Sequence, residues 1–386
     1  KDRYNLDLIQ IPEAHQHTKG EGVKICIIDS GVDTQHIDLD TTTFTGLNTK
    51  SELEWNIDMI PHGTNIAGII SAVHDNAFEV EGIAPDAAIL VIRVFENSSR
   101  DFEFASGLVK AVERCAIAGA KIINMSLGGF DSIDLEQRGF SSLVDRFGLL
   151  IVAAGGNNGF TAKPFYPASY EDVISVGAID KDRKRWYGSQ AFVDIVAPGV
   201  EVLGLLGGTQ SGFERKSGTS IACAHISGVA ALLWSWNPSA TLSEIKTALF
   251  NTAEVLGSGE GKDAEFGYGM VQAMCALIHI NGGSSLEAGA SIPLSCPPYN
   301  ANIPLTPIST PQPTIPPTRQ PTHSPTSLST PPPTQQPTHS TTSLSTPRDI
   351  LGIIYTATNG NRWNQNDNWL TSANHCTWYG INECNA

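Results

Sequence analysis

Three residues of this chain are of the types that together activate a serine hydroxyl. Asp29 ends the apolar run VKICIID, His62 opens the segment HGTNIAG, and Ser220 lies in SGTSIACAH directly before an apolar helical run. A serine hydroxyl is a weak nucleophile that needs an adjacent base, an imidazole can be that base, and a buried carboxylate fixes the imidazole's tautomer. The combination therefore predicts acyl transfer with Ser220 as the nucleophile.

Each of the three residues also has a structural interpretation of its own. An Asp that follows a strand often caps the next segment, and a lone His is more often a hydrogen-bonded structural residue than a base. A Ser before helix-forming residues is often only an N-cap. The catalytic interpretation therefore rests on the three residues occurring together.

The elements that must position these residues alternate along the chain. Short apolar runs rich in β-branched residues indicate buried parallel strands at 23–29, 89–95, 121–127, 149–154, 173–179 and 192–196. Helical patterns lie between them at 62–73, 104–119 and 220–236. The pattern predicts an α/β fold, with a doubly wound, mostly parallel sheet covered by helices on both faces. Ligand sites of such sheets lie at the carboxyl ends of the strands, where Asp29 stands.

Charge and hydropathy argue against several classes of partner. The chain has 386 residues, of which 41% are hydrophobic and 16% charged, and its formal net charge is −15. A negative charge of this size argues against binding to nucleic acid or to anionic lipid surfaces. We expect no membrane span, because no apolar run reaches the ~18–20 residues that a span needs. We expect the mature form, or a fragment, of a secreted or vacuolar protein whose targeting signal is not seen.

Composition divides the chain into three regions. Residues 1–281 carry the strand and helix patterns, whereas residues 282–347 become rich in Pro, Ser and Thr, and PTHSPTSLSTP (321–331) recurs as PTHSTTSLSTP (337–347). Such a segment cannot build a core and indicates an extended linker. Residues 348–386 regain a globular composition, although a module of ~40 residues normally needs a staple or a partner to be stable.

The seven cysteines give an odd count, so at least one thiol is left unpaired. Cys376 and Cys384 lie close together in the Trp-rich tail and are expected to form a disulfide, which would staple the C-terminal module. A cysteine in apolar surroundings is usually a small buried hydrophobic residue. We expect this of Cys26, Cys115, Cys223 and Cys275.

These features resemble the subtilisin family of serine endopeptidases, the subtilases, over residues 4–280. Three active-site segments occur in the family's order, and the segments between them are in register. The matching segments are IIDSGVD (27–33), HGTNIAG (62–68), GIAPDAAILVIRV (82–94), INMSLGG (123–129), AAGGNNG (153–159), YPASYEDVISVGA (166–178), VAPG (196–199), SGTSIACAHISG (217–228) and GYGMVQA (267–273). The resemblance implies a subtilisin-like domain that hydrolyses peptide bonds through an acyl-enzyme.

Carried onto this sequence, the resemblance implies a role for four residues. Asp29 would orient the imidazole, His62 would be the general base and then the general acid, and Ser220 would be the nucleophile. The segment AAGGNNG places the family's oxyanion residue at Asn157, whose amide would bind the tetrahedral oxyanion together with the backbone N–H of Ser220. Taken alone, an Asn beside glycines is also typical of a turn.

Two segments resemble the walls of the family's substrate cleft. Strand addition by an extended peptide would use the first segment, where glycines let two backbones approach closely. The residues concerned are Ser126, Leu127, Gly128 and Gly129 in the first wall and Ala154, Gly155 and Gly156 in the opposite wall. Phe165 falls near the expected floor of the primary pocket, where its ring would favour small or medium substrate side chains.

The chain departs from the family pattern near the nucleophile. Ala224 stands before His225, where the family commonly has Pro, and Cys223 lies one helical turn after Ser220. Because Ala is compatible with a helix, we expect activity to persist, and we expect Cys223 to be buried and inert and His225 to be structural. Many family members carry an inhibitory propeptide, which we do not find in this chain.

The resemblance implies that the chemistry needs no cofactor, while a structural calcium ion is a possible addition. Family members often bind calcium through Asp, Asn and carbonyl oxygens. Asp38, Asp75 and Asn76 fall where one such site is often built. Asp75 and Asn76 lie in the loop that begins at His74. The alternative is a solvated polar loop without a metal.

The tail from Leu351 to Cys384 resembles the N-terminal cap of extracellular leucine-rich-repeat proteins of the plant or algal type. The matching pattern is LGIIYTATNG followed by NW, CTWYGI and a final Cys. No repeats follow, so we expect a truncated chain whose full form binds a protein ligand through its repeats. The alternative is an independent mini-domain held by its disulfide.

Three functions compete. The leading prediction is a secreted serine endopeptidase that acts on peptides or proteins. The second is a recognition protein with a catalytically inactive protease scaffold, which the filled positions Asp29, His62, Ser220 and Asn157 disfavour. The third is another acyl-transfer enzyme with a Glu/Asp/Ser set, which His62 within HGTNIAG disfavours.

Overall fold

The computed structural model describes most of the first of the three predicted regions. The described residues are 3–282, except 49–53, 59, 77, 79, 96–104, 162 and 258–260, together with Cys296. The predicted linker, apart from residue 282 and Cys296, and the whole predicted C-terminal module with Cys376 and Cys384 lie outside them.

Helices and strands alternate through the described residues, as the apolar runs predict. In chain order the elements are α1 (Tyr4–Leu8), α2 (Ile11–Ala14), β1 (Lys24–Asp29), a 3₁₀ turn (Thr41–Thr43), β2 (Phe44–Asn48), α3 (Gly63–Ser71), β3 (Ala88–Arg93), α4 (Ala105–Ile117), β4 (Ile122–Met125), α5 (Asp134–Phe147), β5 (Leu150–Ala154), β6 (Val173–Ile179), β7 (Ile195–Pro198), β8 (Val202–Leu206), β9 (Gly212–Lys216), α6 (Thr219–Trp236), α7 (Leu242–Asn251) and α8 (Ala273–Ile280).

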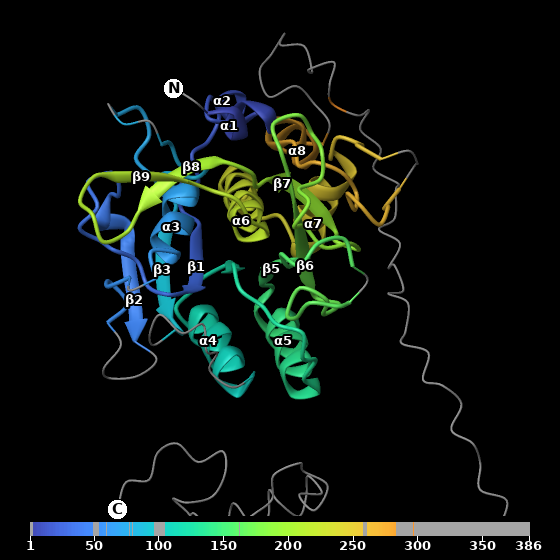
Figure 1. Cartoon of the computed structure of the whole chain (residues 1–386), viewed down its shortest axis with the longest axis horizontal. Helices are drawn as coiled ribbons and strands as arrows, with labels where there is room; N and C mark the ends of the chain where they lie inside the picture. Colours follow the sequence, from blue (N-terminus) through green and yellow to red (C-terminus); the bar gives the residue numbers. More distant parts are fainter. Residues whose placement is uncertain are drawn as a thin grey trace, which may run out of the picture. The chain divides into compact units, whose positions relative to one another are not determined.

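Seven of the strands form one parallel sheet with the order β2-β3-β1-β4-β5-β6-β7 (Figure 1). The chain enters near the middle of the sheet at β1, builds β2 and β3 on one side, and then crosses to β4 on the other. The strand order therefore reverses between β1 and β4, and binding crevices of parallel sheets open at such a reversal. The predicted doubly wound parallel sheet is confirmed.

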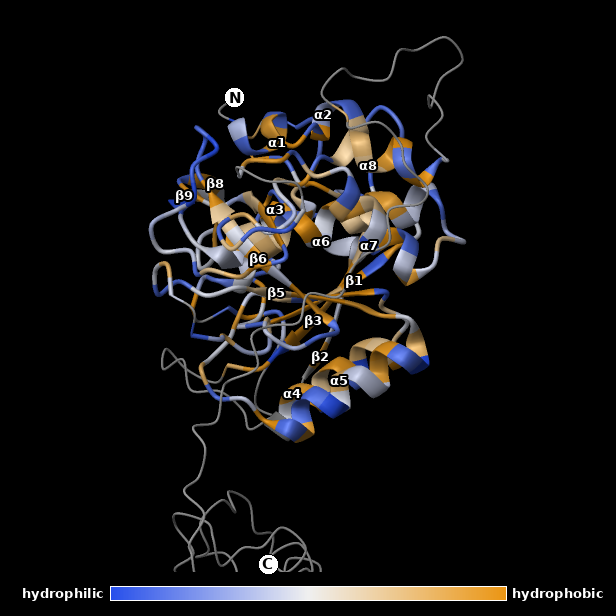
Figure 2. Cartoon of the chain, turned by 90° about the vertical axis from the view of Figure 1, so that its right-hand side faces the viewer, coloured by the Kyte–Doolittle hydropathy of each residue, from blue (hydrophilic) through white to orange (hydrophobic). Residues whose placement is uncertain are grey.

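Helices cover both faces of this sheet (Figure 2). α4 and α5 lie on one face, and α3 and α6 lie on the other. Successive side chains of β1 enter two separate apolar cores: Ile25 and Ile27 belong to the core under α6, and Cys26 and Ile28 to the core over α4 and α5. A strand buried on both faces has no polar side to present, which explains the continuous apolar runs in the sequence.

α6 is the central helix, and its apolar character serves the core. By length and composition it is long and apolar enough to cross a membrane, but 83% of the 18-residue window is buried inside the domain. A helix that is apolar all round is expected in the middle of a large domain as well as in a bilayer. We therefore interpret α6 as a core helix.

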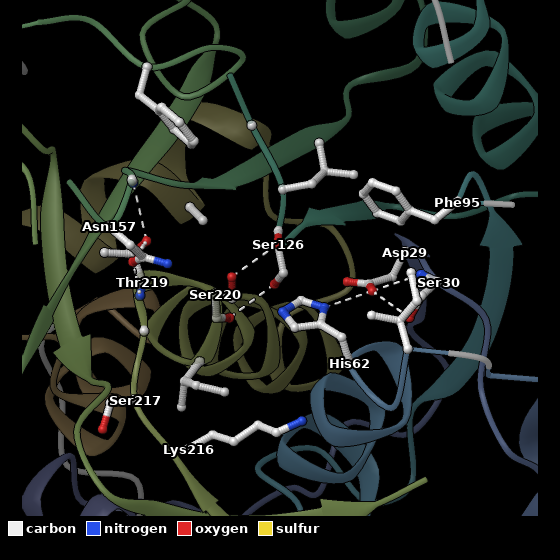
Figure 3. Close-up of a pocket in the computed structure, with 18 of the residues that line it drawn as sticks. Asp29, Ser30, His62, Phe95, Ser126, Asn157, Lys216, Ser217, Thr219 and Ser220 are labelled. Atoms are coloured by element: carbon white, nitrogen blue, oxygen red, sulfur yellow. Dashed lines mark hydrogen bonds and ion pairs between the residues drawn. The ribbon is translucent and has the colours of Figure 1, made fainter. Parts of the chain in front are cut away.

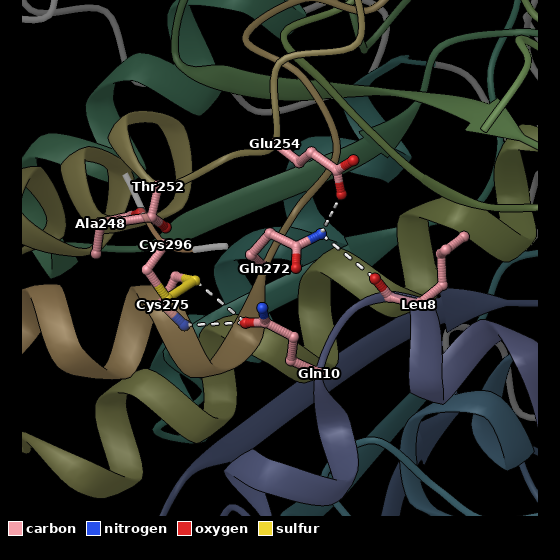
Figure 4. The surroundings of a disulfide bond; sticks show 8 residues. All are labelled: Leu8, Gln10, Ala248, Thr252, Glu254, Gln272, Cys275 and Cys296. Carbon is pink, nitrogen blue, oxygen red and sulfur yellow. Dashed lines mark hydrogen bonds between the residues drawn. A yellow bond between two sulfur atoms is a disulfide. The ribbon is translucent and has the colours of Figure 1, made fainter. Parts of the chain in front are cut away.

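The first four cysteines are all buried, as expected, but three of them form disulfides, which was not predicted. Cys26 of β1 is bonded to Cys115 of α4, across a separation of 89 residues, and Cys275 of α8 is bonded to Cys296 (Figure 4). Cys223 is the free, buried thiol among the described residues. The apolar surroundings were predicted, but which cysteines face one another across a strand and a helix depends on the tertiary packing, which local sequence does not show.

An antiparallel hairpin outside the main sheet, formed by β8 and β9, leads into the serine-bearing helix. Its register joins Val202 to Lys216 and Leu206 to Gly212. β9 ends at Lys216, three residues before α6 starts at Thr219. The hairpin therefore brings Arg215 and Lys216 beside the start of α6.

Candidate active site

Asp29 is the last residue of β1, and its side chain is fully buried. Its Oδ1 accepts hydrogen bonds from the backbone N–H of Ser30 at 2.7 Å and from Nδ1 of His62 at 2.7 Å. Because an ionised carboxylate only accepts hydrogen bonds, Nδ1 of His62 carries a proton. In the neutral ring, Nε2 is then the atom with the free lone pair, so the contact with Asp29 selects the tautomer that a general base requires.

His62 caps the N-terminus of α3, and two neighbouring side chains hold the start of this helix. Asp58 Oδ2 accepts from the backbone N–H of Thr64 at 2.8 Å and from its hydroxyl at 2.7 Å. The hydroxyl of Ser30 donates to Asp58 Oδ1 at 2.8 Å and accepts from the N–H of Gly63 at 2.9 Å. These bonds satisfy N–H groups that a helix start leaves unpaired, and they tie α3 to the end of β1.

The surroundings of His62 raise the pKa of its imidazole above the ordinary value of 6.5. Burial is the largest single effect and lowers the pKa, but the charge of Asp29 and its hydrogen bond raise it and prevail. The charge of Lys216 lowers the pKa, and that of Asp58 raises it. The site is therefore built to stabilise an imidazolium, which is the form that a general base reaches after it takes a proton.

Ser220 is the second residue of α6, and Ser126 holds it in place. The hydroxyl of Ser220 donates to the carbonyl oxygen of Ser126 at 3.0 Å, and the hydroxyl of Ser126 donates to the carbonyl oxygen of Ser220 at 2.9 Å. Asn124 donates to the hydroxyl of Ser126 at 3.0 Å. These bonds join the start of α6 to the end of β4, across the point where the strand order reverses.

The ring of His62 lies between Asp29 and Ser220 (Figure 3). Within the described part of the chain, no hydrogen bond joins the Ser220 hydroxyl to the imidazole, because the hydroxyl is turned toward the Ser126 carbonyl. Catalytic hydrogen bonds of this type are often loose before substrate binds.

Asn157 lies on the other side of Ser220, and Thr219 holds its side-chain amide. Its Oδ1 accepts hydrogen bonds from the backbone N–H of Thr219 at 2.9 Å and from the Thr219 hydroxyl at 2.8 Å. With its oxygen engaged, the amide presents Nδ2 in the direction of Ser220 (Figure 3). The N-terminus of α6 adds backbone N–H groups and a partial positive charge to the same region.

These residues share one cavity of about 600 Å³. The sequence-predicted residues that line it are Asp29, His62, Ser126, Leu127, Gly128, Ala154, Gly156, Asn157, Phe165 and Ser220. Two predicted residues, Gly129 and Gly155, are not in its lining. The two backbone hydrogen bonds of Gly129 with Tyr166 are both 2.7 Å long, and Gly155 donates to the carbonyl oxygen of Val176 at 2.9 Å, so these glycines brace the walls.

Sequence reasoning did not single out several residues that complete the cavity. Arg215 and Lys216 enter it from β9, and Phe95 and Ile60 line it as well. Lys216 also donates to the carbonyl oxygen of Pro61 at 2.8 Å. The two basic residues stand directly before SGTS in the sequence, so their position was a signal that they lie near the serine.

A comparison with protein families identifies the domain that contains this site. The profile described as the subtilase family matches residues 20–269. The chain belongs to the subtilase family. Subtilases are serine-type endopeptidases, so the catalytic domain is that of a hydrolase of this class.

Several curated proteins are similar to this subtilase. Thermitase from Thermoactinomyces vulgaris is 37% identical over 265 residues, which cover 67% of this chain and 90% of thermitase. Subtilisin DY from Bacillus licheniformis is 35% identical over 261 residues, 66% of this chain and 92% of the relative. A thermophilic serine proteinase from Bacillus sp. (strain AK1) is 36% identical over 268 residues, and the match covers 68% of this chain but 63% of that protein.

A solved structure shares the fold. The crystal structure of the psychrophilic subtilisin-like protease Apa1 from the Antarctic psychrotroph Pseudoalteromonas sp. AS-11 superposes with a TM-score of 0.66. The similarity covers 72% of this chain and 98% of that chain at 23% sequence identity. At this identity the comparison supports the fold, and the chemistry has to be argued from the residues of this chain.

The Phe165 ring lies between the two predicted walls of the cleft. A Cβ atom at Gly128 would overlap the ring, and one at Gly156 would lie 2.9 Å from its Cγ, so the ring contacts both glycines closely. The edge of the ring meets Phe130, with 5.4 Å between ring centroids at an interplanar angle of 79°. Packed from three sides, the Phe165 ring is held as part of the cavity wall.

The two departures from the subtilase pattern, Cys223 and Ala224, and the neighbouring His225 are all buried in α6. Cys223 donates to Asn124 Oδ1 at 3.4 Å, and burial raises the pKa of its thiol far above the usual range, so the thiol stays protonated. His225 donates from Nδ1 to the carbonyl oxygen of Ile221 at 2.8 Å and accepts from Asn5 at 3.0 Å. Burial lowers the His225 pKa to about 4, so the ring is a neutral structural group.

The predicted calcium ligands are only partly brought together. Asn76 donates from its amide to Asp38 Oδ1 at 2.5 Å, and Asp38 is fully buried. Asp75 is exposed, with a φ of 54°, on the turn before Asn76. Asp38 and Asn76 carry the oxygen donors that calcium prefers.

Proposed function

We propose that this subtilase is a secreted serine endopeptidase that uses Asp29, His62 and Ser220 as its catalytic triad. The observation that carries the proposal is the 2.7 Å contact of His62 with a fully buried Asp29, in one cavity with Ser220. The contact leaves Nε2 of a neutral ring as the base, and the ring lies between Asp29 and Ser220 (Figure 3).

The chemistry proceeds in two steps. Ser220 Oγ gives its proton to His62 Nε2 and attacks the carbonyl carbon of the scissile bond, and the tetrahedral oxyanion is bound by Asn157 Nδ2 and the Ser220 backbone N–H. The C–N bond then breaks, the leaving amine takes the proton from His62, and an acyl-enzyme remains. Water, deprotonated by the same imidazole, attacks the ester carbon and releases the acid and the Ser220 hydroxyl.

We propose that substrate binds as an extended strand along Ser126, Leu127 and Gly128. Addition of a strand supplies main-chain hydrogen bonds without regard to sequence, so selectivity falls to the pocket in which the Phe165 ring lies. This ring reduces the depth of the pocket and favours small or medium side chains. A library of peptides that is cleaved best after large aromatic residues would contradict this assignment.

The remaining parts of the proposal concern location and partners. Two disulfides in the described residues suit an oxidising, extracellular compartment. We propose that residues 282–347 are a linker, that residues 348–386 are a leucine-rich-repeat cap, and that further repeats would bind a protein ligand. We also propose an inhibitory propeptide as a natural ligand of the cleft, and a structural calcium ion at Asp38 and Asn76 that takes no part in the chemistry.

The proposed nucleophile is tested by labelling with a fluorophosphonate, which reacts with activated serines. We expect the folded protein to be labelled and Ser220→Ala to lose all label and all peptidase activity. Ser239→Ala is the control, because Ser239 is exposed and its hydroxyl bonds to Asn237 away from the cavity. If the folded parent protein were not labelled, an inactive recognition scaffold would be the better explanation.

A further inference from the structure

Three side chains that can bind a metal converge outside the catalytic cavity. His15 lies at the C-terminal end of α2, and His74 and Glu81 lie in the loop between α3 and β3. Ring nitrogens of the two histidines and a carboxylate oxygen of Glu81 all lie within 4.8 Å of one another. None of the three lines the catalytic cavity, so the cluster needs an explanation of its own.

The hydrogen bonds of His15 fix which of its nitrogens faces the cluster. Nε2 lies 2.9 Å from the carbonyl oxygen of Ile83. A carbonyl oxygen only accepts hydrogen bonds, so Nε2 carries the proton and Nδ1 of the neutral ring carries the lone pair. That lone pair faces Glu81 Oε1 at 3.5 Å, which is an acceptor as well.

His74 brings a third potential ligand atom to the same point. Its Nδ1 contacts the Oε1 atom of Glu81 that also faces His15. The Nδ1 atoms of both histidines are shielded from solvent and have no hydrogen-bond partner among the residues that the structure describes. Two imidazole nitrogens and a carboxylate oxygen that converge at one shielded point are a donor set that suits a divalent transition metal.

The two carboxylate oxygens of Glu81 face different partners. Oε1 faces the ring nitrogens of His15 and His74. The other carboxylate oxygen, Oε2, faces Arg3 at 3.7 Å. Oε1 therefore remains directed at the two imidazoles, as a first-row metal site requires.

We propose that His15, His74 and Glu81 bind a zinc ion or a similar divalent transition metal, with water in the fourth position. A tetrahedral zinc site with bonds of ~2.0–2.1 Å separates its ligand atoms by ~3.3 Å. The separation between His15 and Glu81 is 3.5 Å, which already fits. The His74 ring has to move outward from Glu81, and its side chain, 32% exposed on a turn, has room to do so.

The proposed ion would crosslink two segments that are far apart in the sequence. His15 belongs to the N-terminal helices, whereas His74 and Glu81 belong to the loop that follows α3, whose first turn carries His62. The hydrogen bond from His15 to the Ile83 carbonyl orients the ligand from behind, as outer-shell partners do in metal sites. Nitrogen ligands also distinguish this cluster from the oxygen donors Asp38 and Asn76, because calcium prefers oxygen.

The test measures zinc binding to the full chain carrying Ser220→Ala, which prevents self-digestion. After removal of metals with a chelator and dialysis, zinc is titrated by calorimetry and by competition with a chromogenic chelator. We expect one equivalent to bind, and we expect His74→Ala and Glu81→Gln each to weaken binding at least ~100-fold, beyond the 10–100-fold typical of outer-shell changes. His17→Ala is the matched control, since His17 is two residues from His15 and packs on Trp236.

Thermal unfolding gives a second measurement. At a free zinc concentration of ~100 times Kd, the midpoint should rise by ~5 °C in the parent and in His17→Ala, and should not change in His74→Ala. Calcium should not reproduce a shift that depends on His74. Absence of stoichiometric zinc binding, or equal binding by His74→Ala, would overturn the proposal and leave a cluster bridged by protons alone.

Discussion

The oxygen and the nitrogen of the Asn157 side-chain amide face different groups. Its oxygen accepts both hydrogen bonds from Thr219, and its nitrogen is presented toward Ser220. The bonds to Thr219 orient the amide before any substrate arrives. A donor that is already oriented needs no reorganisation when the oxyanion forms, which is why such groups contribute strongly to the rate.

We predict that Asn157→Leu lowers kcat by ~10²–10³ with little change in KM, because the lost bond forms only in the transition state. Steady-state kinetics on a peptide substrate measure both constants. Asn158→Leu is the matched control: Asn158 is the next residue, is exposed and does not line the cavity. Similar losses in both variants would show that the loop, and not the amide, is responsible.

The raised pKa of His62 predicts the pH dependence. The imidazole must be neutral to act as the base, so kcat/KM should fall as the pH drops through a value above 6.5. Lys216 lowers this pKa, so Lys216→Met should move the acidic limb to higher pH. Lys181→Met, which removes an exposed lysine paired with Asp182, should leave the limb in place. A shift of the limb to lower pH in Lys216→Met would contradict the assignment.

At the residue scale, the sequence predicted the candidate catalytic residues that lie together in the cavity but not the residues that hold them. Asp29, His62 and Ser220 lie in short segments in which residue type and strand or helix boundary give the signal together. The roles of Asp58 and Ser126 depend on a hydrogen bond to another element, and no local pattern encodes it. The same limit applies to the disulfide partners.

At the scale of elements, the start of α3 determines the position of His62 relative to Asp29. Asp58 accepts bonds from Thr64 and from Ser30, and thereby fixes the first turn of α3 against the end of β1. His62 stands directly before that turn. A change at Asp58 should therefore affect the position of the base without touching it.

We predict that Asp58→Ala lowers the free energy of unfolding by ~1–3 kcal/mol, because buried donors of Thr64 and Ser30 lose their acceptor. It should also lower kcat/KM by displacing His62. Urea unfolding in the Ser220→Ala background and kinetics of the active enzyme measure the two effects. Asp40→Ala removes an exposed cap of the 3₁₀ turn and should cost ~1 kcal/mol with unchanged kinetics. Unchanged kinetics in Asp58→Ala would show that His62 is positioned by Asp29 alone.

Elements buried on both faces were the easiest to predict. The six apolar runs each overlap a strand of the parallel sheet, because such strands need apolar residues at every position. β8 and β9 were missed. β9 contains Glu214, Arg215 and Lys216 and has no continuous apolar run, and the short run VLGLL of β8 was not singled out. The hairpin is nevertheless the element that places the basic side chains of Arg215 and Lys216 in the cavity.

At the scale of the whole domain, the disulfide between Cys26 and Cys115 links the central strand to a helix on the opposite face from α6. We predict that Cys26→Ala with Cys115→Ala lowers the free energy of unfolding by ~2–4 kcal/mol, since the bond closes a loop of 89 residues in the unfolded chain. Denaturant unfolding in the Ser220→Ala background measures it. Cys223→Ala, which removes a buried thiol without breaking a crosslink, should cost clearly less. Equal costs would attribute the effect to packing.

The reversal of strand order between β1 and β4 has a consequence for the life of the enzyme. Asp29 and Ser220 come from distant parts of the chain and meet only when both sides of the sheet have assembled. We therefore expect a partly folded copy to be inactive, and we expect its exposed backbone to be a substrate for a folded copy. Under mild denaturation, folded copies should digest unfolded copies. The rate of inactivation should therefore increase with protein concentration. This dependence on concentration should disappear when Ser220 is blocked.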